Sequence, residues 1–384
     1  MRSALLPVAV ALAVRMAAIL ASDRVTADVE RYRKVAVHVL DVSWNPYTTP
    51  RLYPYPPLWV WAEAGSEWAA RRWDVSFAVL VKLPVLAADL GIVALLGVMG
   101  RERGAGFLPA WLYAVHPVSV LVSGFHGQFD AIMLVFLLLG MLAFARGRTD
   151  ASAFALAGAI ATKSFPVVTL PFFMLALPGR TERVRFLLLA ALPVALLLIP
   201  YAVHDLPALR RELFGYGGVA DFGWIGLARG GAWLATGELA RSEARYWTAS
   251  IEAGRWLFLA ALAALVYACA TRRLRPTLVE AVLLAFLAFL TLYGAISAQY
   301  LLWVVPMGLL ARDRHVTAHG LAATAALAGF YTFLAPAVLW PGPPPLPPRV
   351  AGALWVAGVG AVLVAGTAWL VRLVVLARRR SLTG

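Results

Sequence analysis

Long apolar runs alternate with short polar connections along most of the chain. A helix that crosses a bilayer needs about 20 mostly apolar residues, and fewer if it stops short of one surface. Runs of this kind lie at 4–22, 75–99, 106–122, 130–146, 186–202, 253–270, 277–294, 298–311, 317–338 and 351–376. The pattern predicts an all-α, polytopic integral membrane protein.

A further apolar stretch, 151–177, is interrupted by Lys163, Ser164 and Pro166. If this stretch crosses the membrane once, the later Arg-rich loops lie outside, against the positive-inside bias. If it forms two short helices that meet at Lys163, every short Arg-rich loop lies in the cytoplasm: 100–105, 146–150, 178–185, 271–276, 312–316 and 377–384. The second interpretation predicts about 12 membrane segments, including a broken short helix pair at 151–177, with both termini inside.

Composition and charge agree with a charge-sorted membrane protein. The 384 residues are 61% hydrophobic and only 14% charged, and the formal net charge is +14. Because the basic excess falls mostly in the cytoplasmic loops, it argues against nucleic acid as a partner. The single Cys269 excludes an internal disulfide and a Cys-based metal site. We expect an uncleaved first span, because Arg15 interrupts the run and no clean small-x-small site precedes Asp23.

Two long loops, 23–74 and 203–252, face the extracytoplasmic side in this topology. Apolar residues recur at helical spacing in both, as in Val25, Val29, Tyr32 and Val35 and in Leu206, Leu209 and Leu213. Amphipathic helices lying on the bilayer surface would explain this spacing. We expect a single membrane-embedded domain, 1–384, with 23–74 as the catalytic loop.

The first polar cluster follows the first span. Asp28 and Tyr32 are four residues apart, so they share one face of a helix. The carboxylate could equally serve as a first-turn residue favoured by the helix dipole. Asn45, Tyr47, Tyr53 and Tyr55 form a Pro-rich aromatic turn, which could equally be part of an interfacial aromatic belt.

The second cluster is SGFHGQFDAI at 123–132, which places His126, Gln128 and Asp130 between two spans. These side chains could bind phosphate or sugar hydroxyls, although Asp130 could also cap the next helix. Lys163 is a functional candidate because an ionisable group at membrane depth is costly. Arg15 and Asp89 lie within spans and could pair with other buried polar groups.

The chain resembles the GT-C superfamily of polytopic glycosyltransferases that use polyprenyl-phosphate sugars. Within it, the chain especially resembles bacterial mannosyltransferases related to those of GPI-anchor and phosphatidylinositol-mannoside synthesis. The anchors run in family-like order: Asp28 and Tyr32, NPY and YPYPPL, KLPVLAADL at 82–90, HP at 116–117 with GFHGQFDAI, ATKSFPVVTLPF at 161–172, and AQYLLWVVPM at 298–307.

The resemblance implies roles for individual residues. Asp28 matches the catalytic base, although Asp23, Asp41, Asp205 and Asp221 also face outward. The groups expected to bind the donor phosphate are Lys163, His126 and Arg349. Sugar or acceptor contacts are expected from Tyr32, Asn45, Tyr47, Tyr53, Tyr55, Gln128, Asp130, Gln299 and Tyr300. The chain lacks the paired acidic motif of oligosaccharyltransferases, so we expect metal-independent transfer without a cofactor.

These features favour an inverting membrane glycosyltransferase in the cytoplasmic membrane, with its active site on the extracytoplasmic side. It would move a hexose, with mannose expected, from a polyprenyl-phosphate donor to a lipid-linked or cell-envelope acceptor. A transporter or flippase for an anionic substrate is the alternative, with Lys163 as the binding group. A third interpretation is a membrane scaffold whose polar residues are dispensable.

Overall fold

The structure is a computed structural model that describes residues 2–22, 26–340 and 342–383. Every regular element in these residues is helical, apart from isolated bridges between Val219 and Glu243 and between Phe222 and Ile296. The all-α prediction is therefore confirmed. The chain divides into two compact units, which are described separately: residues 1–115, 119–170 and 178–216 form the first, and residues 116–118, 171–177 and 217–384 form the second.

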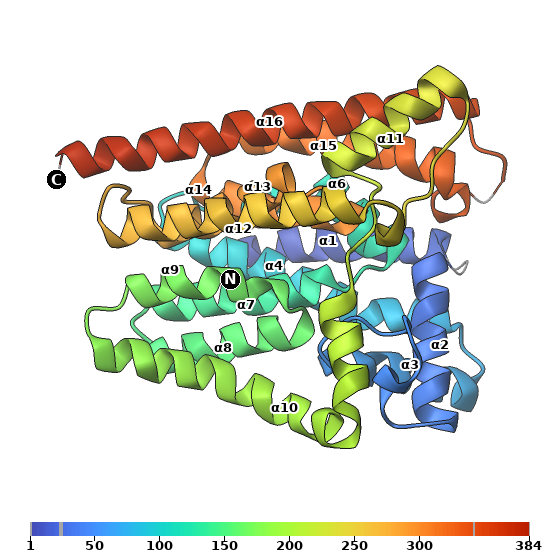
Figure 1. Cartoon of the computed structure of the whole chain (residues 1–384), viewed down its shortest axis with the longest axis horizontal. Helices are drawn as coiled ribbons and strands as arrows, with labels where there is room; N and C mark the ends of the chain where they lie inside the picture. The colour runs from blue at the N-terminus through green and yellow to red at the C-terminus, as the bar shows by residue number, and fades with distance from the viewer. Residues whose placement is uncertain (1, 23–25, 341, 384) are drawn as a thin grey trace. The chain divides into compact units, whose positions relative to one another are not determined.

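The first unit contains the residues of both N-terminal polar clusters, and Figure 1 draws its helices in blue to green. Its elements are α1 (Arg2–Ala21), α2 (Ala27–Asp41), η1 (Pro46–Thr48), α3 (Leu58–Trp73), α4 (Phe77–Glu102), α5 (Leu108–Ala114), η2 (Val120–His126), α7 (Asp130–Ala145), α8 (Thr149–Thr162), η3 (Phe165–Thr169) and α10 (Arg180–Gly215). Helix α7 packs between α4 and α8, and α8 also contacts α10. Buried aliphatic side chains of α4 and α7 form much of this core.

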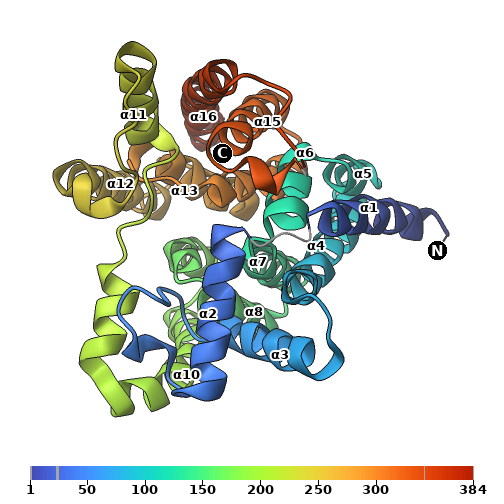
Figure 2. The same cartoon turned by 90° about the vertical axis from the view of Figure 1, so that its right-hand side faces the viewer.

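The second unit contains the C-terminal helices. Its elements are most of α6 (Pro117–Ser119) and α9 (Leu170–Leu175), then α11 (Gly223–Thr236), η4 (Ala244–Tyr246), α12 (Thr248–Ala270), α13 (Leu278–Leu292), η5 (Ala298–Leu302), α14 (Val304–Ala311), α15 (His315–Leu334), η6 (Pro336–Val338) and α16 (Pro348–Thr383). Helices α15 and α16 make the most extensive contact, and Figures 1 and 2 show them side by side. Gly329 allows this approach, because a Cβ there would lie 2.3 Å from the backbone nitrogen of Trp355.

Within the described residues, four helices are long and apolar enough to cross a membrane: α4, α10, α12 and α16. Shorter apolar helices of the described chain include Leu5–Ala21, Asp130–Ala145, Phe165–Leu175, Leu278–Leu292 and Ala298–Ala311. The predicted apolar segments are thus found as helices, and the number of about 12 crossings stays a prediction.

Two apolar segments are broken. The break expected at 151–177 is confirmed, because α8 ends at Thr162, Lys163 is extended with φ −150° and ψ 130°, and η3 begins at Phe165. The segment expected as one span at 106–122 is also broken, with a 47° bend between Leu108–Ala114 and Pro117–His126. Pro117 explains the end of the first piece, because a proline disfavours the helical conformation of the residue before it.

Amphipathic helices were expected in the first long loop, and it folds into α2 and α3, which lie side by side in Figure 2. Val29, Tyr32 and Val35 of α2 are buried within the protein. Val25, which also belongs to the predicted apolar face, lies outside the described residues. The apolar face of α2 therefore packs on protein, whereas Trp61 and Trp68 of α3 are more than half exposed.

Candidate active site

Asp28 lies in the first turn of α2. Thr26 caps this helix, since its side-chain oxygen accepts a hydrogen bond from the Val29 N–H at 3.2 Å. The first turn of a helix favours an acidic side chain, because its unpaired N–H groups carry partial positive charge. The capped start of α2 thus fixes the direction in which the Asp28 carboxylate leaves the chain.

The second cluster comes to Asp28 through an unusual turn. The π-helix η2 ends at His126, and Gly127 follows with φ +79°. A left-handed residue reverses the chain direction, and glycine adopts it without a steric penalty. His126 and Gln128, on either side of Gly127, therefore both reach the same carboxylate.

Asp28 Oδ2 accepts two hydrogen bonds. His126 Nε2 lies 2.9 Å away, and it must carry the proton because an ionised carboxylate only accepts. The Gln128 amide nitrogen also donates to Oδ2. The Gln128 amide oxygen in turn accepts a hydrogen bond of 3.0 Å from the Tyr32 hydroxyl. The structure thus brings together Asp28, Tyr32, His126 and Gln128, four residues singled out from the sequence.

Exposure differs sharply within this group. The Asp28 side chain is 34% exposed, whereas Gln128 and Tyr32 are 1% and 2% exposed. Burial raises the pKa of the Asp28 carboxyl, but the His126 hydrogen bond and the positive charges of His126, Arg31 and Lys163 outweigh it. The pKa therefore lies below its ordinary value, and Asp28 is an accessible anion at neutral pH.

A buried ion pair lies beside this group. The Lys163 ammonium, in the break after α8, donates to both Asp130 oxygens at 2.8 and 3.0 Å. It also lies 5.4 Å from the ring centroid of Phe129 and 5.7 Å from that of Tyr55. Its role in binding a donor phosphate stays a prediction, and so do the sugar-binding roles of Asp130 and Gln128.

The aromatic turn is held by its own hydrogen bonds. The Tyr47 hydroxyl donates to the Tyr55 carbonyl at 2.7 Å, and the Tyr53 hydroxyl donates to the Pro56 carbonyl at 3.0 Å. Asn45 caps η1 and bonds His204 of α10 at 3.0 Å. These contacts give three of the expected sugar-binding residues a structural task, and Tyr55 joins the ring cluster around Phe129.

The remaining expected contact residues belong to the second unit. Gln299 and Tyr300 are buried in η5. The ring centroid of Tyr300 lies 4.4 Å from that of Trp303, the residue after η5. Arg349 is exposed at the start of α16. Their proposed contacts with substrate stay predictions.

The alternative acids have other partners where the structure describes them. Asp41, at the end of α2, pairs with Arg71 at 2.8 Å, and its side chain is 45% exposed. Asp205 lies at a kink in α10 and accepts a hydrogen bond from the Ala208 N–H. Asp221 pairs with Arg229 in the second unit. Asp23 lies outside the described residues.

Two pairs of buried polar groups support the first unit. Arg15 of α1 forms an ion pair with Asp89 of α4, in agreement with the expectation that these two residues pair with buried polar groups. Arg15 also donates a hydrogen bond of 2.7 Å to the hydroxyl of Ser119, the residue before η2. Lys82, which carried no assigned role, donates to Ser22 and Phe125. Its position at the start of KLPVLAADL was the only sequence signal.

A second residue without an assigned role is Glu63 of α3. It is 0% exposed, and neither of its carboxyl oxygens has a hydrogen-bond partner within the described structure. Burial raises the pKa of Glu63 well above its ordinary value, and the neighbouring Trp59 indole offsets little of this effect. Burial therefore favours the neutral form of Glu63, which lies next to Trp59. Sequence alone could not separate it from a solvated helix acid.

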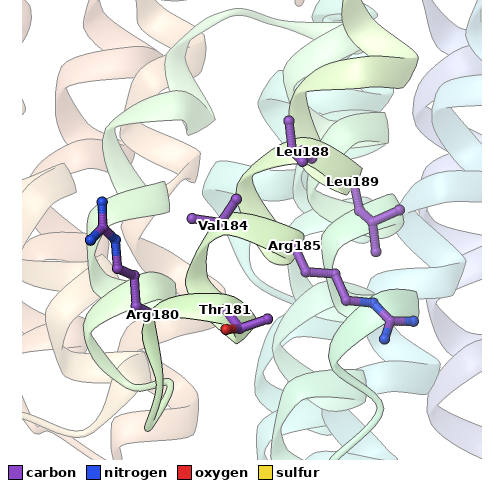
Figure 3. Close-up of a pocket in the computed structure, with 6 residues that line it drawn as sticks. All are labelled: Arg180, Thr181, Val184, Arg185, Leu188 and Leu189. Carbon is purple, nitrogen blue, oxygen red and sulfur yellow. The ribbon is translucent and has the colours of Figure 1, made fainter.

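An open pocket on α10 lies away from this group. Its lining residues all come from the first turns of α10: Arg180, Thr181, Val184, Arg185, Leu188 and Leu189 (Figure 3). Arg185 is 19 positions before His204, the residue that contacts Asn45, which corresponds to about 28 Å along a helix. Figure 3 shows the two arginines diverging rather than converging on one point. We do not assign substrate to this pocket.

Comparison with known proteins gives one family match. Residues 23–179 match the family model described as "Alpha-(1->6)-mannopyranosyltransferase, N-terminal domain". The comparison with curated proteins found no match.

Among solved structures, the chain is similar to ArnT from Cupriavidus metallidurans bound to undecaprenyl phosphate. The identity is 17% and the TM-score is 0.48, over 96% of this chain and 77% of ArnT. The family match includes Asp28, Tyr32, His126, Gln128, Asp130 and Lys163. Residues 23–179 are thus similar to a mannopyranosyltransferase domain, which confirms over that segment the mannosyltransferase resemblance predicted from the sequence.

Proposed function

We propose that this chain is an inverting membrane glycosyltransferase and that Asp28 is its catalytic base. The observation that carries the proposal is the accessible Asp28 carboxylate held by His126 and Gln128. A catalytic base must be reachable by the acceptor and must be held in a fixed direction. The Asp28 carboxylate is accessible, and its two buried hydrogen-bond partners fix its direction. The lowered pKa of Asp28 means that the carboxylate is ionised before substrate arrives, as a base must be.

The proposed reaction is a single displacement. The acceptor hydroxyl oxygen attacks the anomeric carbon of the donor sugar while its proton passes to Asp28. The bond between that carbon and the donor phosphate oxygen breaks, and the electron pair leaves with the polyprenyl phosphate. One displacement inverts the configuration of the anomeric carbon, and no metal or cofactor takes part in the proposed step.

Negative charge grows on the departing phosphate, so fixed cationic groups should accelerate the reaction. Lys163 is the first proposed group, because its ammonium lies beside the aromatic rings and is close enough to Asp28 to affect the pKa of that carboxyl. His126 and Arg349 remain proposed phosphate contacts. Asp130 holds the Lys163 ammonium in place, and a bound phosphate would share that charge.

We further propose mannose as the transferred hexose, a polyprenyl-phosphate donor, and a lipid-linked or cell-envelope acceptor. The match of residues 23–179 to a mannopyranosyltransferase domain supports the sugar. The balanced charge of loop 23–74 supports an active site on the extracytoplasmic side of the cytoplasmic membrane, because positive-inside sorting places the Arg-rich loops opposite to it.

The test measures free polyprenyl phosphate released by the purified protein in lipid vesicles. With polyprenyl-phosphate-mannose and envelope lipids, release should require acceptor and should match the label that enters a new lipid. Movement of intact donor across the vesicle without release would instead support a flippase. Neither release nor movement, repeated with glucose and arabinose donors, would refute the proposed transfer.

A further inference from the structure

Lys82 connects the two segments that build the candidate site. It lies in the second turn of α4, and its side chain is 0% exposed. Its ammonium donates to the Ser22 carbonyl at 2.8 Å, the Ser22 hydroxyl at 2.9 Å and the Phe125 carbonyl at 2.8 Å. An ammonium has three protons to donate, so one buried side chain bonds two segments that lie 103 positions apart.

Both ends of this connection are near residues of the Asp28 group in the sequence. Ser22 follows the last turn of α1, six positions before Asp28, and Phe125 immediately precedes His126. The connection is also close in space, since a Cβ on Gly124 would lie 2.9 Å from the Cβ of Ala18. The position of the ammonium therefore sets where α1 ends relative to η2.

The methylene stem of Lys82 fills the space under Gly127. A Cβ on Gly127 would lie 2.8 Å from Lys82 Cε and 2.9 Å from Cγ. Gly127 is the left-handed residue between His126 and Gln128, the two groups that bond Asp28. The turn that presents both partners of the base is thus packed directly on Lys82.

We propose that Lys82 is a positioning residue that fixes the His126-Gly127-Gln128 turn against Ser22 at the end of α1. The expected effect on sugar transfer rests on the proposed function. The positioning of the turn by Lys82 does not depend on that function. Small displacements of a catalytic group cost a large part of the rate. Loss of Lys82 should therefore lower kcat while the KM for donor stays close to that of the wild type.

The first variant is Lys82→Met, which keeps an apolar stem and removes the three donors. We expect kcat to fall by about tenfold or more and the acid limb of the kcat/KM profile to move to higher pH. The limb moves because burial alone raises the pKa of Asp28, and the displaced His126 no longer opposes it. The matched control is Lys34→Met, which removes an exposed lysine of α2. It should leave kcat and the acid limb of the kcat/KM profile unchanged.

A second readout needs no substrate. Diethyl pyrocarbonate should modify His126 several-fold faster in Lys82→Met, as resolved by peptide mass spectrometry, because His126 is largely buried in the native site. His315, with a side chain 20% exposed, serves as the internal control and should react at the wild-type rate.

Ser22→Ala removes one of the three oxygen atoms that accept hydrogen bonds from the Lys82 ammonium, and it decides the question if Lys82→Met does not fold. It should show both the loss of kcat and the faster modification of His126. Wild-type kcat and wild-type His126 reactivity in either folded variant would overturn the proposal. If the wild-type protein transfers no sugar but His126 alone becomes reactive in the variants, the proposed function fails and the positioning role stands.

Discussion

Replacement of His126 by alanine tests how the site holds its base. His126 donates one of the two hydrogen bonds to Asp28 Oδ2, and the acceptor is ionised. A hydrogen bond to a charged group contributes about 1.5–3 kcal/mol, and each 1.36 kcal/mol is tenfold in rate. The bond holds the carboxylate in one direction, so if that orienting contribution is lost, transfer should fall roughly 10- to 150-fold.

The same change should alter the pH dependence. Burial raises the pKa of Asp28 and the His126 hydrogen bond lowers it, so the alanine variant should lose activity at a higher pH on the acid side. The assay is kcat/KM for donor from acid to neutral pH, since this ratio reports groups of the free enzyme. His126→Gln should recover part of the rate, because its amide can donate. Full activity in the alanine variant, or an unmoved acid limb, would refute the reasoning.

Three further changes separate stability from catalysis. Arg15→Met leaves the Asp89 carboxylate buried without its ion-pair partner, so it should cost about 3–5 kcal/mol of unfolding free energy; adding Asp89→Leu should recover most of this, as measured by thermal unfolding in nanodiscs. Glu63→Gln should stabilise the protein increasingly as pH rises above 4.5, because only the unfolded wild type ionises there; a pH-independent difference in melting temperature would contradict this. Lys163→Met should impair both stability and transfer, whereas Lys163→Met with Asp130→Leu should regain stability alone; recovered transfer would remove Lys163 from the active site.

Much of the helical organisation could be predicted, because apolar runs and breakers act locally. The break at Lys163 was predictable from Pro166 and from the placement of the Arg-rich loops. The additional break near Pro117 was missed, because the surrounding run is apolar enough to read as one span. The sequence also did not show whether the apolar face of α2 packs against protein or against lipid. Apolar residues recur with a period of about 3.6 in both cases.

The candidate site was predicted in its residue types but not in its connections. The spacing of Asp28 and Tyr32 indicated a shared helix face, and the sequence between two spans singled out His126 and Gln128. Which of them would bond the carboxylate depends on the π-helix and the left-handed Gly127, which no spacing rule gives. The supporting roles of Lys82 and Glu63 depend on long-range packing, and a single sequence without that packing does not distinguish them from ordinary span and surface residues.

The most direct test of the central claim is transfer of labelled mannose by the purified Asp28→Asn protein in lipid, with polyprenyl-phosphate-mannose as donor. The matched control is Glu30→Gln, a neighbouring acid of α2 whose side chain is 57% exposed and paired with Lys34. A general base typically contributes about 100- to 10,000-fold to a rate. We predict a loss of that size in Asp28→Asn with donor binding retained, and wild-type transfer in Glu30→Gln. Near-normal transfer by folded Asp28→Asn would contradict the assignment of Asp28 as the base.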